Sequence, residues 1–496
     1  MKLSILSTVS ALALVAAAPA YAQSNNSTVT QTGTNATATV MQGGSKSKSD
    51  ITQGGDLNSA TVNQNGSKSG GKSTIDQVGS SNTASVTQSD DASGSTPNTV
   101  STVNQSGSFN GATVVQNNST AALQSNSTVT QSGETNGANV TQLDDGQNST
   151  VTQSGIGSMA TVAQGNATKA LTDDSWGNGS AVAQSGTGGH IANVSQGTEH
   201  NQSSVVQDGN LNLADVGQAG GDGNVSTVSQ GGAGNDALIT QNGTSGFSSV
   251  AQTGTNGLAQ LNQGGGIDND SYITQSNDHQ VAVVTQTGNT NTSTINQSSL
   301  SGIGSASGLP GGYNDTGLAI VSQVGNDLKS DVLQNGRSTF AFIDQAGSDN
   351  SSDVDQSGNA VVANVDQAAS GSNNSAKINQ SGTLANFNLN SGIHQSGSNN
   401  ISEIDQSGTG TLAGGFDQNA DNIADNSQTG SNNNSLITQG GLDNFASVLQ
   451  SGAGNISTVT QGGSLNDAFV TQSSADNVST VTQSGTGNTA SVTQGN

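Results

Sequence analysis

The stretch Asn477–Gln494 reads NVSTVTQSGTGNTASVTQ and holds two copies of one phrase, N-x-[SA]-x-V-x-Q, with a Gly-bearing turn between them. Gln483 and Gln494 close the two copies and define an eleven-residue step. Backwards from Gln494, 39 such Gln anchors reach to Gln31, and 26 of the 38 gaps between them have this same length. A period this regular decides the fold class before any local motif is considered.

Each phrase has the alternation of a β-strand. The residue two before the anchor is Val or Ile at 36 of the 39 anchors, and the residue four before it is nearly always Ser or Ala. Counting back in twos from Gln483 gives Val481, Ser479 and Asn477, which therefore share one face of an extended strand. Intervening residues are polar and variable, and Gly follows most anchors by two residues, so each phrase predicts a strand and a turn.

The choice between Ser and Ala reveals a longer unit. It alternates without a break from Ser27 to Ala363, so the true repeat is a 22-residue unit with two strands and two turns. The predicted fold is all-β: a parallel β-solenoid with two strands per 22-residue coil, about 19 coils and amyloid-like cross-β stacking at roughly 4.8 Å. Identical side chains then lie above one another, and each buried Gln, Asn and Ser is expected to hydrogen-bond to its copies.

The residues expected to carry this structural ladder are the inward Gln, Val or Ile, and Ser or Ala of each strand. At the two ends of the chain they are Val29, Gln31, Val40, Gln42, Ile51, Gln53, Val62, Gln64, Ser479, Val481, Gln483, Ala490, Val492 and Gln494. Two Val or Ile per coil contribute roughly 3 to 6 kcal/mol of burial, whereas fixing all the residues of one coil costs at least about 20 kcal/mol of backbone entropy. A single coil is therefore unfolded, and stability comes from neighbouring coils.

The chain divides into a signal peptide and one repeat domain. Residues 1–22 contain Lys2, an apolar run and the cleavage-like Ala20-Tyr21-Ala22, which predict secretion, and no other span is apolar enough to cross a membrane. Residues 23–496 form the repeat domain, with predicted insertions near 89–98, 117–124, 165–176 and 298–314. The segment 380–428 is degenerate, and its last phrase, where Asn426 replaces the apolar residue, is predicted to be an insertion, which leaves 38 strands.

Composition excludes several classes of protein. Only 29% of residues are hydrophobic and 9% are charged, and cysteine is absent, so neither a large apolar core nor disulfides hold the chain. The net charge of -25 excludes a nucleic-acid binder that relies on phosphate contacts. The four histidines, His190, His200, His279 and His394, have no partners at catalytic or metal-binding spacing. We therefore expect no enzyme, no catalytic residues, no cofactor and no metal site.

Outward residues leave two binding alternatives open. Asp344, Asp355, Asp366, Asp405 and Asp417 each precede an anchor, and Asp344 and Asp366 are expected to stack on adjacent coils. A cation ladder is one interpretation, and like-charge residues that slow self-association are the preferred one. Outward Thr-x-Thr pairs such as Thr128/Thr130 admit an ice-binding surface, and one Gly-rich phrase at 231–239 resembles a calcium-binding nonapeptide. β-propensity and turn formation explain these features more simply.

The repeat resembles that of the curlin family, the amyloid subunits of bacterial curli fibres. The phrase Asn212-Leu-Ala214-Asp-Val216-Gly-Gln218 looks like the curlin repeat, especially that of the minor, nucleator-type subunit, and such phrases cover nearly all of residues 25–494. The resemblance implies secretion, polymerisation into cell-surface fibres, biofilm matrix and adhesion, with other curlin-type subunits and an outer-membrane export channel as partners. This chain departs from the family in its many more repeats and in repeats that begin almost at the cleavage site.

The sequence thus predicts a secreted, extracellular structural protein that self-associates end to end into fibres. Repeats that run almost to the C-terminus favour this interpretation, since an uncapped solenoid end is a template for another chain. The alternative is a monomeric β-solenoid adhesin or surface-binding module, calcium-binding or ice-binding, which needs polar caps at both ends.

Overall fold

The computed structural model describes residues 24–66, 70–90, 99–118, 124–143, 145–165, 177–298, 317–336, 338–358, 361–382, 389–408 and 422–495. These residues form 38 β-strands and no helix. They fall into two compact units, Met1–Gly234 and Asn235–Asn496, each of which is built in the same way. The predicted all-β class is confirmed.

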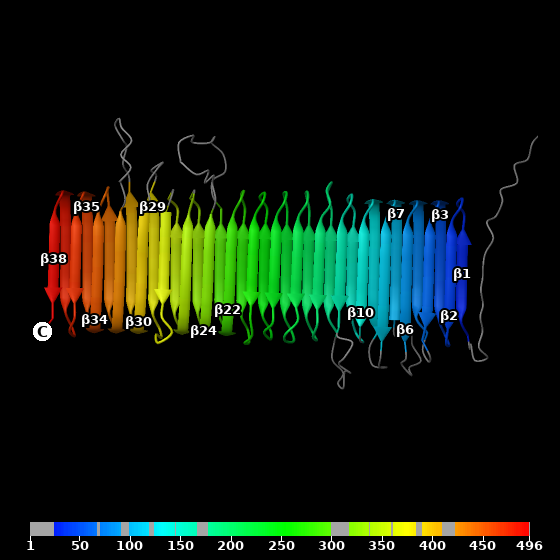
Figure 1. The fold of residues 1–496 in the computed structure, drawn as a ribbon, viewed down its shortest axis with the longest axis horizontal. Helices are drawn as coiled ribbons and strands as arrows, with labels where there is room; N and C mark the ends of the chain where they lie inside the picture. Colours follow the sequence, from blue (N-terminus) through cyan, green and yellow to red (C-terminus); the bar gives the residue numbers. More distant parts are fainter. Residues whose placement is uncertain are drawn as a thin grey trace, which may run out of the picture. The chain divides into compact units, whose positions relative to one another are not determined.

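The first unit contains two parallel sheets, one of odd-numbered and one of even-numbered strands (Figure 1). The odd strands are β1 (Asn26–Gln31), β3 (Lys48–Asp56), β5 (Lys72–Ser80), β7 (Thr99–Ser108), β9 (Ser125–Glu134), β11 (Asn148–Gln153), β13 (Gly179–Gln184), β15 (Gln202–Gln207) and β17 (Val225–Gln230). The even strands are β2 (Thr37–Gly43), β4 (Ser59–Asn65), β6 (Thr83–Asp90), β8 (Gly111–Asn118), β10 (Gly137–Leu143), β12 (Met159–Gln164), β14 (Ile191–Gln196) and β16 (Leu213–Gln218).

The second unit repeats this arrangement. Its odd strands are β19 (Phe247–Gln252), β21 (Asp270–Gln275), β23 (Thr292–Gln297), β25 (Lys329–Gln334), β27 (Ser351–Gln356), β29 (Ser375–Gly382), β31 (Ile401–Gly408), β33 (Asn434–Gly440), β35 (Ile456–Ser464) and β37 (Val478–Thr486). Its even strands are β18 (Asp236–Gln241), β20 (Leu258–Gln263), β22 (Val281–Asn289), β24 (Leu318–Asn326), β26 (Phe340–Ser348), β28 (Val361–Gln367), β30 (Leu389–Ser398), β32 (Ile423–Ser431), β34 (Phe445–Ala453), β36 (Asp467–Gln472) and β38 (Thr489–Gln494).

Within each unit, every strand pairs in parallel with the strand one coil away, and the pairing is in register. In the first unit β1 pairs with β3 so that Gln31 lies opposite Gln53, and β2 pairs with β4 so that Ala38 lies opposite Ala60. In the second unit β35 pairs with β37, which places Val459 opposite Val481. Each unit is therefore a parallel β-solenoid with two strands per coil, as the 22-residue period predicts.

The core of each coil lies between the two sheets and follows from the period-2 pattern. Strand β4 has the burial pattern of alternating half-buried and buried residues, with Ala60, Val62 and Gln64 inside. The intervening positions face solvent because successive strand residues point to opposite faces. The inward Val and Ile side chains are almost completely buried throughout the inner coils. Each strand contributes one residue to each column of the core.

The turns are sterically constrained, and some of their positions accept only glycine. Gly107 has φ of +106° and Gly133 has φ of +122°, a region that residues with a side chain rarely adopt. A Cβ on Gly107 would lie 2.1 Å from the carbonyl oxygen of Gly133 in the next coil. The turn glycines are thus required twice, by their own backbone conformation and by the close approach of the coil stacked on them.

The structure corrects one assignment within the degenerate segment. The phrase that ends at Gln428, which we predict from the sequence to be an insertion, is strand β32, and it pairs in register with β30 and β34. The predicted total of 38 strands agrees, while residues 409–421 with the Gln418 phrase lie outside the described residues. The predicted signal peptide lies outside the described residues too, as do 91–98, 119–123, 166–176 and 299–316, which hold most of the predicted insertions.

Asn426 explains why the Gln428 phrase looked degenerate, and it gives a stability prediction. Its side chain is fully buried between Ile393 and Val448, donates from Nδ2 to the Ser402 hydroxyl, and leaves Oδ1 without a partner. Because an unsatisfied buried acceptor costs about 1 to 3 kcal/mol, we expect Asn426→Val to raise the free energy of unfolding by about that amount. The measurement is the denaturant midpoint of the full chain.

The matched control for this variant is Asn364→Val. Asn364 lies on β28 of the same sheet but points outward and is exposed, so its replacement should leave the midpoint nearly unchanged. A lower midpoint for Asn426→Val than for the wild type would contradict the prediction and would show that the contact with Ser402 outweighs the unpaired oxygen.

Candidate functional site: the amide ladders and the end strands

The inward glutamines form a hydrogen-bonded ladder along each sheet. In the first unit Gln31 Nε2 donates to Gln53 Oε1 at 2.7 Å, and Gln53 Nε2 donates to Gln77 Oε1 at 2.7 Å. In the second unit Gln461 Nε2 donates to Gln483 Oε1 at 2.9 Å. A primary amide carries its donor and its acceptor on separate atoms, so one hydrogen bond can span the strand spacing of about 4.8 Å. All these bonds run in one direction, with the earlier glutamine donating to the later one.

The same amides also join the two sheets. The second proton of Gln53 Nε2, on β3, is donated to the backbone carbonyl of Thr37 at the start of β2, 3.1 Å away. Gln472 on β36 makes the equivalent bond to the Ile456 carbonyl of β35 at 3.1 Å. Each anchor amide therefore links its coil to the next coil and one sheet to the other. The period in the sequence predicts the first set of bonds, and nothing in it singles out the second.

The asparagines that precede many of the strands hold the turns. Asn466 Nδ2 donates to Asn444 Oδ1 at 3.0 Å and to the carbonyl of Gly485 at 3.2 Å, and the Asn466 backbone N–H also donates to Asn444 Oδ1. The residue before such an asparagine has positive φ even where it is not glycine, as at Leu465 with φ of 57°. The asparagine side chain thus satisfies turn carbonyls that water would otherwise have to reach.

The serine column behaves differently from the prediction. The expectation that each buried Ser hydrogen-bonds to its copies is wrong for most of this column. The hydroxyls without a hydrogen-bond partner are those of Ser49, Ser73, Ser101, Ser127, Ser149, Ser180, Ser203, Ser226, Ser248, Ser271, Ser293, Ser330, Ser352 and Ser435. The side chain is too short, because a single oxygen close to the backbone stays about one strand spacing from its copy. Ser here acts as a small residue opposite the Ala of the other sheet.

The structure places the predicted ladder residues at the edges of the two units. In the first unit Val29 lies opposite Ile51 and Val40 opposite Val62, and the Gln42 amide donates to Gln64 Oε1 at 2.9 Å. The inward Val and Gln side chains of β1 and β2 are half-buried, whereas the inward Ile, Val and Gln side chains of β3 and β4 are buried. Within the described residues, strands β1 and β2 each pair along one edge, and the Oε1 atoms of Gln31 and Gln42 accept no hydrogen bond.

The last strands of the second unit have the complementary edge. Ser479 Oγ contacts Ser457 Oγ at 3.3 Å, and Ala490 and Val492 on β38 lie opposite Ala468 and Val470. Gln494 Oε1 accepts from Gln472 Nε2 at 2.8 Å, while its own Nε2 donates to a backbone carbonyl, that of Val478. Gln483 Oε1 likewise accepts from Gln461 Nε2, but its own Nε2 donates to two backbone carbonyls, those of Asp467 and Asn488. Within the described residues, this edge therefore presents the amide donor of Gln494, and the edge at β1 and β2 presents the amide acceptors of Gln31 and Gln42.

The outward acidic residues form only short columns. Asp344 lies opposite Asp366, as predicted, and the column continues to His394, whose Nδ1 lies 2.9 Å from Asp366 Oδ2. Asp355 and Asp405 both lie opposite Asn379, and Asp417 is outside the described residues. No group of three or more His, Asp or Glu side chains that could hold a metal ion occurs in the part of the chain that the structure describes.

A second charged column gives a prediction of pH dependence. Burial raises the pKa of Asp353 above its ordinary value, and the neighbouring carboxylate of Asp331 adds to this while Lys377 opposes it. A raised folded-state pKa means that the folded chain binds more protons than the unfolded chain, so stability falls as the pH rises from below the ordinary value of 3.8. We expect Asp353→Asn to be more stable than the wild type at pH 7, and the difference to vanish below that value.

Thermal unfolding of both chains at pH 7 and pH 3 measures this. The control is Asp215→Asn, which removes one carboxylate from the corresponding outward position of β16. Equal stabilisation by both variants at pH 7 would show that the effect comes from net charge alone and would contradict the local cause.

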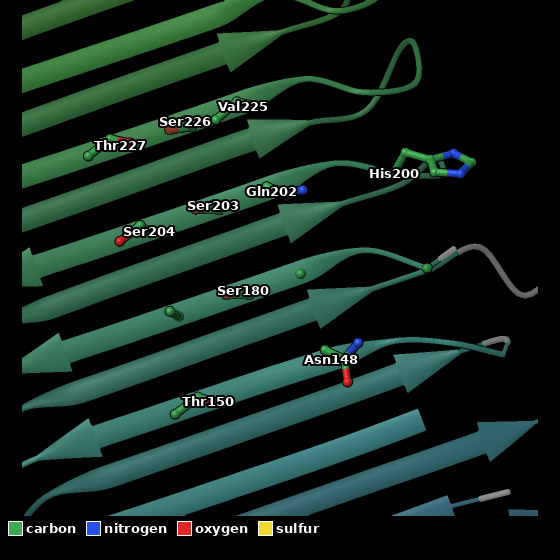
Figure 2. A pocket seen from close by; sticks show the side chains of 13 residues that line it. Asn148, Thr150, Ser180, His200, Gln202, Ser203, Ser204, Val225, Ser226 and Thr227 are labelled. Carbon is green, nitrogen blue, oxygen red and sulfur yellow. The ribbon is translucent and has the colours of Figure 1, made fainter. Parts of the chain in front are cut away.

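A hollow of about 650 Å³ lies on the outer face of the first unit, over β11, β13, β15 and β17 (Figure 2). The surface is hollowed here because Gly179 has no side chain and Ala181 has a small one. Around these two residues lie Asn148, Thr150 and Gln202. His200, in a turn with φ of 60°, is the one histidine among the residues that line the hollow. These lining residues include no pair of a nucleophile and an oriented base, so the hollow contains no catalytic arrangement.

Two segments, 325–358 and 441–473, match the family model of the curlin associated repeat. Each contains three successive anchors, Gln334 to Gln356 in the first and Gln450 to Gln472 in the second. The chain therefore carries curlin repeats. The matched segments of the curlin-repeat protein lie in β24–β27 and β34–β36, and their strands pair in the same register as the strands of the first unit. The resemblance stated from the sequence is confirmed, and the nucleator-type subclass stays a prediction.

No curated protein matches the curlin-repeat chain significantly. Its repeat and its solenoid are those of a curli-type structural protein. No helix in the described residues is long and apolar enough to span a membrane. The features that sequence reasoning missed are the bonds from anchor amides to the opposite sheet and the left-handed residue before each turn asparagine. The recurrent Asn six residues before the anchor was the available signal for the second.

Proposed function

We propose that this curlin-repeat protein is a secreted structural subunit that polymerises head to tail into curli-like amyloid fibres of the cell surface and biofilm matrix, where it supports adhesion. The observation that carries the proposal is the one-directional glutamine ladder. It leaves acceptors on β1 and β2 and a donor on β38 within the described residues. Such edges are complementary, and a heterologous contact that does not close generates a filament.

The backbone supports the same assembly. Strands β37 and β38 pair with β35 and β36 on one side, and no strand among the described residues pairs with their other side. An unprotected edge is a template for another chain. Strands β1 and β2 of a second chain carry the same kinds of inward side chain as the next coil would. Joining the two edges continues both the backbone ladder and the glutamine ladder without a new type of contact.

The place of action follows from the family and from residues 1–22. Their apolar run and the Ala20-Tyr21-Ala22 site have the form of a secretory signal. We propose export through an outer-membrane channel and growth of fibres outside the cell, with other curlin-type subunits as further partners. A net charge of -25 keeps subunits apart before assembly.

The proposal is tested by diluting denatured chain into buffer and following thioflavin fluorescence and size-exclusion profiles together. We expect the monomer peak to disappear as fluorescence rises, and aligned fibres to diffract with a meridional reflection near about 4.8 Å. A monomer that persists with β-type circular dichroism would overturn the proposal and would identify a monomeric solenoid that binds a surface.

A further inference from the structure

One outer face of the second unit is apolar, in a protein whose outward residues are mostly polar. Five neighbouring strands, β20, β22, β24, β26 and β28, contribute to it, and β22 and β24 are labelled next to each other in Figure 1. The face consists of Leu258, Val281, Val283, Leu318, Ile320, Phe340, Phe342 and Val362, and we name it the apolar face. All eight side chains are half-buried or exposed, although their strand neighbours Ala282, Val284, Ala319 and Val321 fill the core.

The in-register pairing makes the apolar face continuous. Val281, Leu318 and Phe340 lie opposite one another on successive strands. Val283, Ile320 and Phe342 form a second column beside them, two residues further along each strand. Gln260 and Asn364 end the second column on its two sides. Contiguous outward apolar residues on a flat sheet, bounded by polar residues, are typical of an interaction surface.

The charges around the face restrict its partner. The adjoining outward column on the same strands carries Thr285, Ser322, Asp344 and Asp366, so the rim on that side is neutral to acidic. A partner with an anionic surface, such as nucleic acid or an acidic bilayer, would be repelled there. A flat apolar sheet fits best against a surface of the same kind, because two sheet faces pack at about 10 Å with interdigitated side chains.

We propose that the apolar face pairs with the apolar face of a second copy of this chain in a neighbouring fibre, and so joins fibres laterally. The inference rests on the proposed function, since it requires fibres. A two-fold axis parallel to the stacking direction reverses the strands, so the column of Phe340 meets the column of Phe342. The same operation places the two acidic columns with Asp344 on opposite rims, where they do not face each other.

The area of the apolar face explains why two such faces pair in fibres and not between single chains. Strand spacings of about 4.8 Å and a rise of about 3.3 Å per residue give roughly 250 Å² per copy, or about 500 Å² for a pair. A specific, stable interface buries at least about 1,000 Å². Single chains therefore stay apart through this face, whereas a fibre repeats the contact once per chain and gains strength by multivalency.

The test compares wild-type fibres with fibres of the double variant Ile320→Thr and Phe342→Thr. Threonine favours strands and is common at outward positions here, so the variant keeps its fold and its growth. We expect wild-type fibres to lie in pairs by electron microscopy, and the paired fraction to fall by about tenfold or more in the variant. Thioflavin growth rates of the two should be equal. The matched control, Leu436→Thr and Phe469→Thr, removes one aliphatic and one aromatic outward residue away from the apolar face and should still pair.

A second measurement replaces a single residue of the apolar face and leaves the other seven in place. The chain has no cysteine, so Phe342→Cys and Phe469→Cys each accept a single nitroxide label. Spin–spin broadening in fibres labelled at 342, and its absence at 469, is the expected result. Paired fibres of the double variant, unpaired wild-type fibres, or wild-type fibres that bind neutral phosphatidylcholine vesicles through this face without pairing would each overturn the lateral contact alone. A wild type that forms no fibres would overturn the proposed function as well.

Discussion

Val481→Asp is expected to abolish fibre growth at the end that carries β37 and β38. Val481 lies opposite Val459 in the inward column and is 5% exposed although its strand pairs along a single edge. An incoming chain would bury it completely, and a carboxylate cannot be buried there without a partner. The lost apolar contact and the buried charge together cost more free energy than the pairing of one edge strand provides. We expect no rise in thioflavin fluorescence on the timescale of wild-type assembly.

Thr482→Asp is the matched control for this variant. It adds the same charge to the same strand, but Thr482 points outward and is exposed, so assembly should proceed. Seeding with wild-type fibres is a second check on this variant. Wild-type seeds offer a normal edge to which a Val481→Asp chain can add its intact β1 and β2. Fibres of Val481→Asp that grow at the wild-type rate without seeds would contradict end-to-end assembly through β37 and β38.

The sequence determines the register of each unit because the inward columns leave no freedom. A slip of one residue would turn Gln31, Val29 and their equivalents to solvent, and a slip of two would place Gln over Val. The 22-residue period therefore predicts both the pairing of β1 with β3 and that of β36 with β38. The same columns predict the glutamine ladder, since an amide can bond to its own copy at the strand spacing.

Other features depend on distances that a periodic pattern does not contain. Asn426 on β32 interrupts the apolar column, and its hydrogen bond to Ser402 on β31 of the other sheet depends on the space that the serine column leaves. Most hydroxyls of that column are unpaired because their reach is shorter than one coil, which the recurrence of Ser cannot reveal. Left-handed backbone at Leu465 or Phe109 was also hidden, because neither residue prefers it and the turn asparagine enforces it.

The apolar face of the second unit illustrates a third limit. Inward positions repeat because the ladder requires them, whereas outward positions are free to vary and carry no period. Phe340 and Phe342 look like ordinary variation within one phrase, and only the in-register pairing of the five strands from β20 to β28 in this sheet brings eight such residues together. Surface function in a solenoid is therefore a property of stacking, and it becomes visible once the coils are aligned.

Gly107→Ala is expected to cost roughly 3 kcal/mol or more of stability at its turn, because it combines left-handed strain with a steric clash. Gly107 has φ of +106°, and the new methyl group would lie 2.1 Å from the carbonyl oxygen of Gly133. Stacked coils prevent either turn from moving away without breaking the Thr135 N–H bond to the Ser108 carbonyl. Denaturant midpoints and amide exchange of the turns around residues 107 and 133 measure the loss.

The control for this variant lies four residues away and should change stability in the opposite direction. Gly111 begins β8, has negative φ and has no atom within 4 Å of the place that a methyl group would take, so Gly111→Ala should stabilise the chain by about 0.5 kcal/mol through the unfolded state. Solenoid coils contact only their neighbours, so faster exchange in Gly107→Ala should be confined to the adjoining coils. Uniform destabilisation across the unit, or equal effects at positions 107 and 111, would mean that the turns do not hold the coils in register.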